Sequence, residues 1–143
     1  MKNVKYINLG LQDSWEQKLD KQIPTILLAS RNYLDKTDHN MFFNSIKNLN
    51  LLWLTFIGER ADLLEDEFDN LIELESIKCE QLLDVLTTNH SFQTICRNSV
   101  EDILHEYLVM SNIGLERCQL ISFLDLNSSD DLILYKSIMK NLQ

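Results

Sequence analysis

Apolar side chains recur at three- and four-residue spacing along most of the chain, a pattern typical of helices with one buried face. Short polar turns separate the segments, which implies antiparallel packing of successive helices. The sequence therefore predicts an all-α fold, a single antiparallel helical bundle of five to six helices in one domain of residues 1–143. The spacing predicts helices over residues 14–35, 38–57, 59–87, 92–110, 111–123 and 130–142.

Side chains suited to helix capping stand at the beginning of several segments. Gln17 follows the first of these caps by three residues, as in a capping box. Pro24 lies inside the first segment and is expected to kink or split that helix, because it lacks a backbone N–H. The expected caps are Ser14, Asp38, Ser91 and Ser128.

Glycine and proline are scarce, with three glycines and one proline in 143 residues. A domain of many strands joined by tight turns needs more of these residues. The scarcity therefore favours helices over strands.

The segment 59–87 has the most regular pattern and predicts a long amphipathic surface helix. At ~100° per residue, its apolar positions share one side, which we expect to enter the core. These positions are Leu64, Phe68, Leu71, Ile72, Cys79, Leu82, Leu83 and Leu86.

Six carboxylates line the opposite edge of the same predicted helix. Several pairs are four residues apart, a spacing at which like charges repel by a few tenths of a kcal/mol. A face that is merely solvated usually mixes glutamate with lysine, so the stripe indicates a basic partner, with a solvated face as the alternative. We call these residues the acidic stripe: Asp62, Asp66, Asp69, Glu73, Glu80 and Asp84.

The formal net charge is −9, and residues 59–84 supply most of it with ten acidic and two basic residues. Such a field repels nucleic-acid backbones and anionic lipid and attracts basic surfaces. Direct binding to nucleic acid or to a membrane surface is therefore not expected.

The longest apolar run, residues 49–58, is far shorter than the ~20 residues of a membrane helix. The first 14 residues lack the apolar stretch of a signal peptide. Three cysteines, Cys79, Cys96 and Cys118, are far apart and odd in number. They predict free thiols in a reducing compartment rather than a disulfide framework or a zinc site. The expected location is the cytoplasm.

Motifs for catalysis and cofactor binding are sparse. Asp102 and His105 have the i, i+3 spacing of a metal-ligand pair, but di-iron carboxylate bundles use such a motif twice. The chain has no P-loop, no G-x-G-x-x-G and no G-x-S-x-G. No metal site and no cofactor are expected.

The segment Arg97-Asn98…His105-Glu106-Tyr107 resembles the Arg-(four to six residues)-His motif of HEPN-domain ribonucleases. Those enzymes are small helical bundles that cleave RNA. The resemblance therefore implies a helical fold and RNA cleavage by Arg97 and His105. Here seven residues separate the two side chains, and on a continuous helix their α-carbons would lie ~12 Å apart along the axis.

The sequence thus predicts a non-enzymatic protein-binding module. The favoured role is an acidic inhibitor or neutraliser of a basic partner, similar in class to immunity proteins and antitoxins, with the acidic stripe as the binding surface. A helical adaptor or host-factor-binding protein with an apolar groove is the alternative. A small ribonuclease or metalloenzyme built on Arg97, Asp102 and His105 is a third. Partner identity and oligomeric state stay open.

Overall fold

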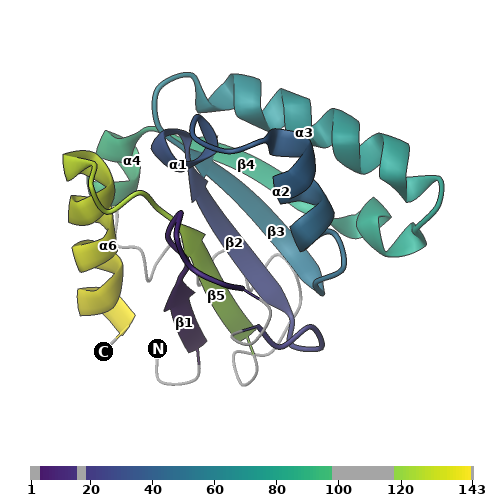
Figure 1. Cartoon of the computed structure of the whole chain (residues 1–143), viewed down its shortest axis with the longest axis horizontal. Helices are drawn as coiled ribbons and strands as arrows, with labels where there is room; N and C mark the ends of the chain where they lie inside the picture. The colour runs from purple at the N-terminus through teal and green to yellow at the C-terminus, as the bar shows by residue number, and fades with distance from the viewer. Residues whose placement is uncertain (1–3, 16–18, 98–117, 143) are drawn as a thin grey trace.

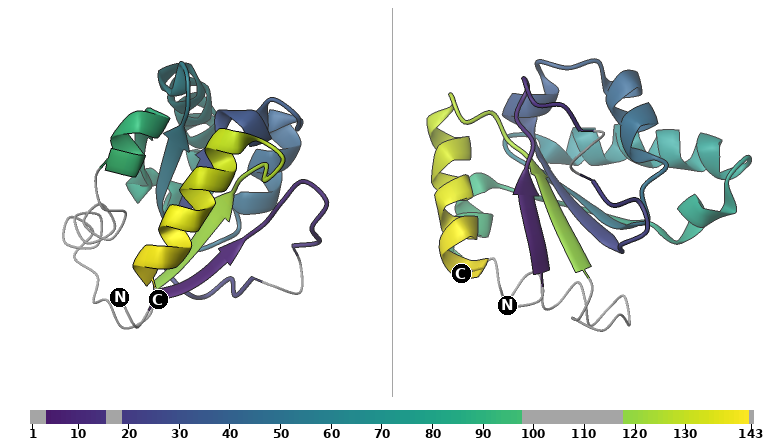
Figure 2. Two further views of the ribbon diagram at one scale, coloured as in Figure 1. Left: turned by 90° about the vertical axis from the view of Figure 1, so that its left-hand side faces the viewer. Right: turned by 60° about the horizontal axis from the view of Figure 1, so that its bottom comes forward.

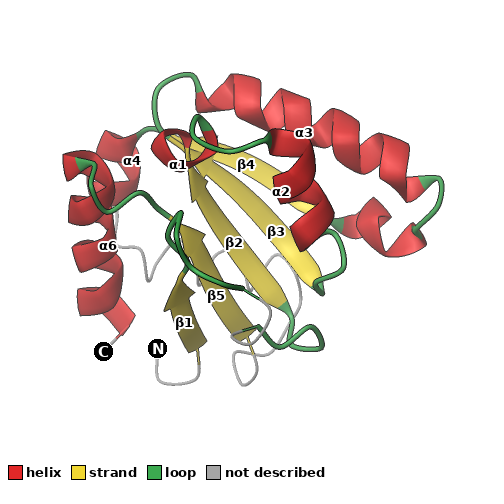
Figure 3. Ribbon diagram, viewed as in Figure 1, coloured by secondary structure: helices red, strands yellow, loops and turns green. Residues whose placement is uncertain are grey.

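The computed structural model describes residues 4–15, 19–97 and 118–142, and its centre is a five-stranded sheet (Figure 3). Every strand pair is parallel, and the strand order is β1-β5-β2-β3-β4. The strands are β1 (Val4–Asn8), β2 (Thr25–Ser30), β3 (Leu51–Ile57), β4 (Leu86–His90) and β5 (Cys118–Phe123).

Helices cover both faces of this sheet (Figures 1 and 2). The helices α1, α2 and α3 pack on one face, and α4 and α6 pack on the other. A short 3-10 helix, η1, follows α3. The bounds are α1 (Arg31–Leu34), α2 (His39–Ile46), α3 (Ala61–Ser76), η1 (Glu80–Asp84), α4 (Phe92–Arg97) and α6 (Ser129–Leu142).

The prediction of an all-α helical bundle is therefore wrong. The three inner strands are buried on both faces, and every residue of β2 and β5 is buried. Such strands are almost continuously apolar instead of alternating, so they do not show the two-residue period of a half-exposed strand. Over five to seven residues, a run of this kind fits the apolar stripe of a buried helix equally well.

Glycine scarcity gave misleading support to the helical prediction. Parallel strands are joined by crossover segments, usually helices, and need no tight hairpin turns. Successive strands of this chain are parallel wherever they pair, as β2 with β3 and β3 with β4. Few glycines are therefore compatible with five strands.

Several predicted helices contain strands. The segment 14–35 includes β2, 38–57 includes β3, and 111–123 ends in β5, although residues 111–117 lie outside the described part. The segment 59–87 is divided into α3, η1 and the first residues of β4. The segment 92–110 begins as α4, and its residues after 97 are not described.

Two of the four expected caps, Asp38 and Ser91, are confirmed by hydrogen bonds, whereas no described helix begins at Ser14. Asp38 caps α2 by accepting a hydrogen bond from the Met41 N–H. Ser91 accepts a hydrogen bond from the Thr94 N–H at the beginning of α4. The predicted last helix, 130–142, is confirmed as α6. A capping side chain acts over three residues and does not depend on the rest of the fold.

The core has one part on each side of the sheet. On the α3 side, Leu64, Phe68, Ile72 and Leu82 are buried as predicted. Leu71 and Cys79 are half-buried. Leu86 is 40% exposed, because β4 is the outermost strand, so its assignment to the core is wrong. The side chain of Leu83 lies outside the described residues.

Within the described ranges, no helix combines the length and the apolar composition needed to cross a membrane.

Candidate functional site

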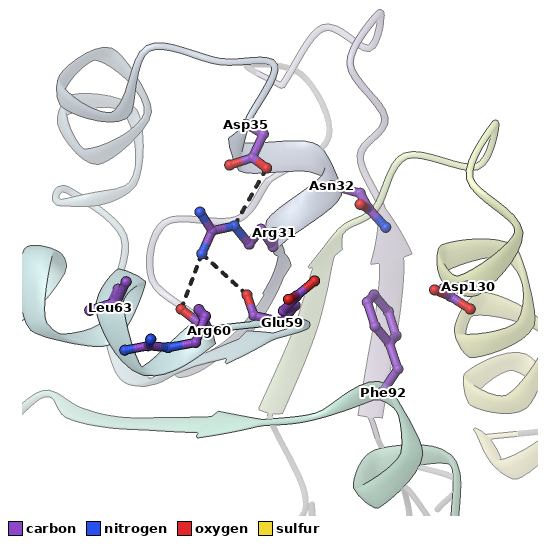
Figure 4. Close-up of a pocket in the computed structure, with 8 residues that line it drawn as sticks. All are labelled: Arg31, Asn32, Asp35, Glu59, Arg60, Leu63, Phe92 and Asp130. Atoms are coloured by element: carbon purple, nitrogen blue, oxygen red, sulfur yellow. Dashed lines mark hydrogen bonds and ion pairs between the residues drawn. The ribbon is translucent and has the colours of Figure 1, made fainter.

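The carboxyl ends of the strands lie at the same end of the sheet and surround a crevice of about 470 Å³ (Figure 4). From β2 the chain continues to β3 and β4 on one side and later returns to β5 on the other. The gap between β2 and β5 is thus a topological switch point, where open α/β sheets commonly bind ligands. The lining residues are Arg31, Asn32, Asp35, Glu59, Arg60, Leu63, Phe92 and Asp130.

Next to the crevice, a buried carboxylate joins β2, β5 and α6. Asp131 is fully buried and accepts hydrogen bonds from Ser30 Oγ at 2.5 Å and the Asp125 N–H at 2.7 Å. Asn32 Nδ2 donates to its other oxygen at 2.9 Å and to Ser128 Oγ at the same distance. These bonds fix the loop after β5 against the end of β2, so the crevice edge is preformed.

Asp125, the second buried carboxylate here, is paired with Lys36. Its side chain is only 3% exposed and also accepts a hydrogen bond from the Asn127 N–H at 3.1 Å. The hydrogen bond from Lys36 holds the pKa of Asp125 below its ordinary value, against the opposite effect of burial. We therefore expect Asp125 to be ionised at neutral pH.

Replacing Lys36 by methionine is expected to destabilise the protein in a pH-dependent way. Because the pKa of Asp125 is lower in the folded chain than the ~3.9 of an unfolded chain, its contribution is full above that value. The contribution is lost as the pH falls through the folded pKa. We expect Lys36→Met to lower the free energy of unfolding by about 1–2 kcal/mol at pH 7 and by less towards pH 2.

Urea unfolding between pH 2 and pH 7 measures this effect. The exposed Lys21 provides a control, because Lys21→Met removes the same charge away from a buried carboxylate. An equal pH dependence of the wild type and Lys36→Met would contradict the role given to Lys36.

Gly58 allows the close approach of the segments after β2 and β4. Its φ of 128° is rarely adopted by other residues. A Cβ at this position would lie 3.1 Å from Arg31 Cβ and 3.2 Å from Phe92 Cε2. The close packing of Arg31 and Phe92, two crevice residues, around this position therefore favours glycine here.

The two arginines of the crevice already have internal partners. Arg31 Nη1 donates to the carbonyl oxygens of Glu59 and Arg60, at 3.2 Å each, and its Nε lies 3.5 Å from Asp35 Oδ2 (Figure 4). Arg60 pairs with Asp62 through two contacts of 3.1 and 3.2 Å. These contacts raise the pKa of Arg60 and lower that of Asp62. The guanidinium charges are thus largely compensated.

Two carboxylates of the crevice have no hydrogen bond or ion pair within the described ranges, although Glu59 helps to raise the pKa of the neighbouring Arg60. Glu59 follows β3, Asp130 lies in the first turn of α6, and both are exposed. The Phe92 ring lies between them in the view of Figure 4. Carboxylates beside an aromatic face suit an ammonium or guanidinium group better than an anion.

The acidic stripe is divided between two elements, because the chain turns after α3 and Cys79 is extended, with φ −136° and ψ 100°. All six side chains are exposed. Asp62, Asp66, Asp69 and Glu73 share one side of α3, whereas Glu80 and Asp84 lie in η1.

The two flanks of α3 differ in how their acids are compensated. On the flank facing α2, Glu67 pairs with His39, and Glu75 Oε1 lies 3.1 Å from Lys47 Nζ. On the flank facing β4, Asp69 accepts a hydrogen bond from the neutral Thr87 hydroxyl at 2.6 Å. Two acids on the α2 flank thus have a basic side chain as partner, and on the stripe itself Arg60 pairs with Asp62 at the beginning of the helix.

In the described part of the chain, Asp66, Glu73, Glu80 and Asp84 have no cationic partner. Together with Asp69 they form a negative surface that runs from the β4 side of α3 to η1.

The residues considered for catalysis are not brought together by anything the structure describes. Arg97 is the last residue of α4, and Asp102 and His105 lie outside the described residues. The helical bundle implied by the HEPN resemblance is not the observed fold. Within the described ranges, no three His, Cys, Asp or Glu side chains are placed to hold a metal ion.

Cys79 and Cys118 are free thiols. Cys118 is buried in β5, and burial raises its pKa to about 11. It is therefore a protonated core residue at neutral pH, not an activated nucleophile. Cys79 is half-buried beside η1.

In comparisons with known proteins, the chain matches no family model, and no curated protein or solved structure shows significant similarity to it. Fold and geometry are thus the basis for assigning a function.

Sequence reasoning found the acidic stripe but missed the crevice. Its residues come from separate segments, and only the strand order brings them together. One signal was present: polar residues follow the apolar runs directly, as Arg31-Asn32 after β2 and Glu59-Arg60 after β3.

Proposed function

We propose that the protein is a non-enzymatic binding module whose acidic stripe contacts a basic surface of a partner protein. The observation that carries this proposal is the unequal compensation of charge on α3. His39 of α2 and Lys47, the residue after α2, pair with Glu67 and Glu75. On the other side only Asp62 has such a partner, Arg60, and Asp66 and Glu73 have no cationic partner in the described structure.

Like-charge repulsion along α3 and η1 costs stability, and a basic partner would convert this cost into attraction. A concentrated negative field also accelerates the encounter with a positively charged surface. This combination suits a neutraliser of a basic protein, in the manner of immunity proteins and antitoxins. The free thiols of Cys79 and Cys118 fit a reducing compartment such as the cytoplasm.

Capture from a lysate of the source cells, followed by salt elution, tests the proposal. The test variant is Asp66→Lys/Glu73→Lys, because neither carboxylate has a described partner whose loss would perturb the fold. Asp20→Lys/Asp130→Lys changes the net charge equally and serves as the control. We expect the wild type and the control to capture the same basic protein, and the test variant to lose it.

The crevice supports a second candidate, in which a cationic group binds between Glu59, Asp130 and the Phe92 ring. The same variants separate the two candidates. If Asp20→Lys/Asp130→Lys loses the partner and Asp66→Lys/Glu73→Lys retains it, the partner binds at the crevice and not at the acidic stripe. Retention by every variant at high salt would favour the apolar-groove adaptor, because screening hardly affects apolar contacts.

A further inference from the structure

The strand β4 forms one edge of the sheet. Its register with β3 is unbroken from Trp53↔Leu86 to Ile57↔His90, and no described strand pairs with its other side. Its residues are half-buried or exposed, whereas those of β2 and β5 are all buried. Among the described residues, no strand covers the outer edge of β4.

Alternation along the strand shows which backbone groups point outward. The His90 carbonyl accepts a hydrogen bond from the Gly58 N–H at 3.0 Å, so His90 and Thr88 direct their backbone groups towards β3. Thr87 and Asn89 direct theirs away from β3. Their side chains bond to α3, Thr87 to Asp69 and Asn89 to Glu65 at 2.7 Å.

This edge lacks several of the features that normally prevent strand addition. Residues 86–90 include no lysine, no proline and no bulge. The opposite edge strand, β1, carries the exposed Lys5. The two edges therefore differ, and β4 is the one suited to accept a further strand.

A hollow of about 220 Å³ lies beside the beginning of β4, between α3 and η1. Its apolar residues are Ile72, Leu82 and Val85, and Asp69 and Glu73 of the acidic stripe also line it. An apolar side chain with basic neighbours matches this combination of an apolar floor and an acidic rim.

We propose that β4 accepts an extended basic segment of the partner protein as a sixth strand, with one apolar side chain in this hollow. This inference rests on the proposed function and specifies its binding mode. Main-chain hydrogen bonds would supply affinity, and the hollow and the carboxylates would supply specificity. A second copy of the chain is disfavoured as the occupant, because it would bring the same negative surface and a net charge of −9.

Six-residue peptides of sequence Lys-Thr-Val-Thr-Lys-Thr are the probes, because the valine and both lysines then point to the same face of the added strand. One peptide is unmodified. Two carry N-methyl groups on every second residue, one on the odd-numbered and the other on the even-numbered positions, and we call these the two phases. An added strand bonds through one of its edges only, so one phase should bind like the unmodified peptide. The other should bind at least tenfold more weakly, as measured by calorimetry at low salt.

Thr87→Pro and Thr87→Val provide the matched test on the protein. Both remove the hydroxyl that bonds to Asp69, but only proline removes the outward N–H. We expect Thr87→Pro to weaken binding of the unmodified peptide at least tenfold. Thr87→Val should change the affinity for this peptide by less than twofold. If Thr87→Pro does not fold, the N-methylated peptides on the wild type decide the question.

The outcomes separate the two proposals. Equal binding of both N-methylated phases, abolished by Asp66→Lys/Glu73→Lys, would overturn strand addition and leave the acidic stripe as the binding surface. Absence of salt-dependent binding by any of these basic peptides would count against the acidic stripe itself.

Discussion

Replacing Asp131 by alanine is expected to lower the free energy of unfolding by about 3–5 kcal/mol. The substitution leaves Ser30 Oγ and the Asp125 N–H without their acceptor in a buried site, and the half-buried Asn32 Nδ2 loses one of its two acceptors. Each unsatisfied buried group costs about 1–3 kcal/mol. Urea unfolding followed by circular dichroism measures the change.

The adjacent Asp130 provides the control, because it lies in the same helical turn but is exposed. Asp130→Ala should change stability by at most about 1 kcal/mol, through the helix dipole. A loss below 1 kcal/mol for Asp131→Ala would show that the buried network does not hold β2, β5 and α6 together.

Phe68→Ala is expected to cost about 3–5 kcal/mol, which approaches the total stability of many domains. Phe68 is fully buried where α3 packs on the sheet. Its ring centroid lies 5.0 Å from that of Phe56 on β3 and 5.9 Å from that of Phe42 on α2. The alanine variant would leave a cavity between two helices and the sheet.

The exposed Asn70 on the same helix is the control, and Asn70→Ala should change stability by less than about 0.5 kcal/mol. If Phe68→Ala also cost less than 1 kcal/mol, α3 would not pack through the face described here.

The predictions that held depend on short stretches of sequence. Asp38 caps a helix through a hydrogen bond to a residue three positions away. The spacing of Leu64, Phe68 and Ile72 places them on one side of α3, whatever the helix packs against. The helix phase was therefore correct although the fold class was wrong.

The strands were missed because their signal depends on the tertiary structure. The run 26–29 in β2 is apolar on both faces, because helices cover both sides of a parallel sheet. Without knowledge of the partner strands, this run is equivalent to part of a buried helix. The exposure of Leu86 likewise follows from the position of β4 at the edge of the sheet, which periodicity does not encode.

The same distinction between local and tertiary signals applies to the acidic stripe and the crevice. Asp66, Asp69 and Glu73 lie within one helix, so their common face could be read from spacing. Glu59 and Asp130 are 71 positions apart, and the sheet order alone brings them to one crevice. The same is true of Ser30 and Asp131, whose bond joins residues 101 positions apart.

The association rate of the captured partner, measured against ionic strength, tests the acidic stripe most directly. We expect Asp66→Lys/Glu73→Lys to associate about tenfold or more slowly than the wild type at low salt. The two rates should converge at high salt, where screening removes the long-range attraction. Equal association rates of the wild type and the variant at low salt would contradict the proposal that the acidic stripe binds a basic partner.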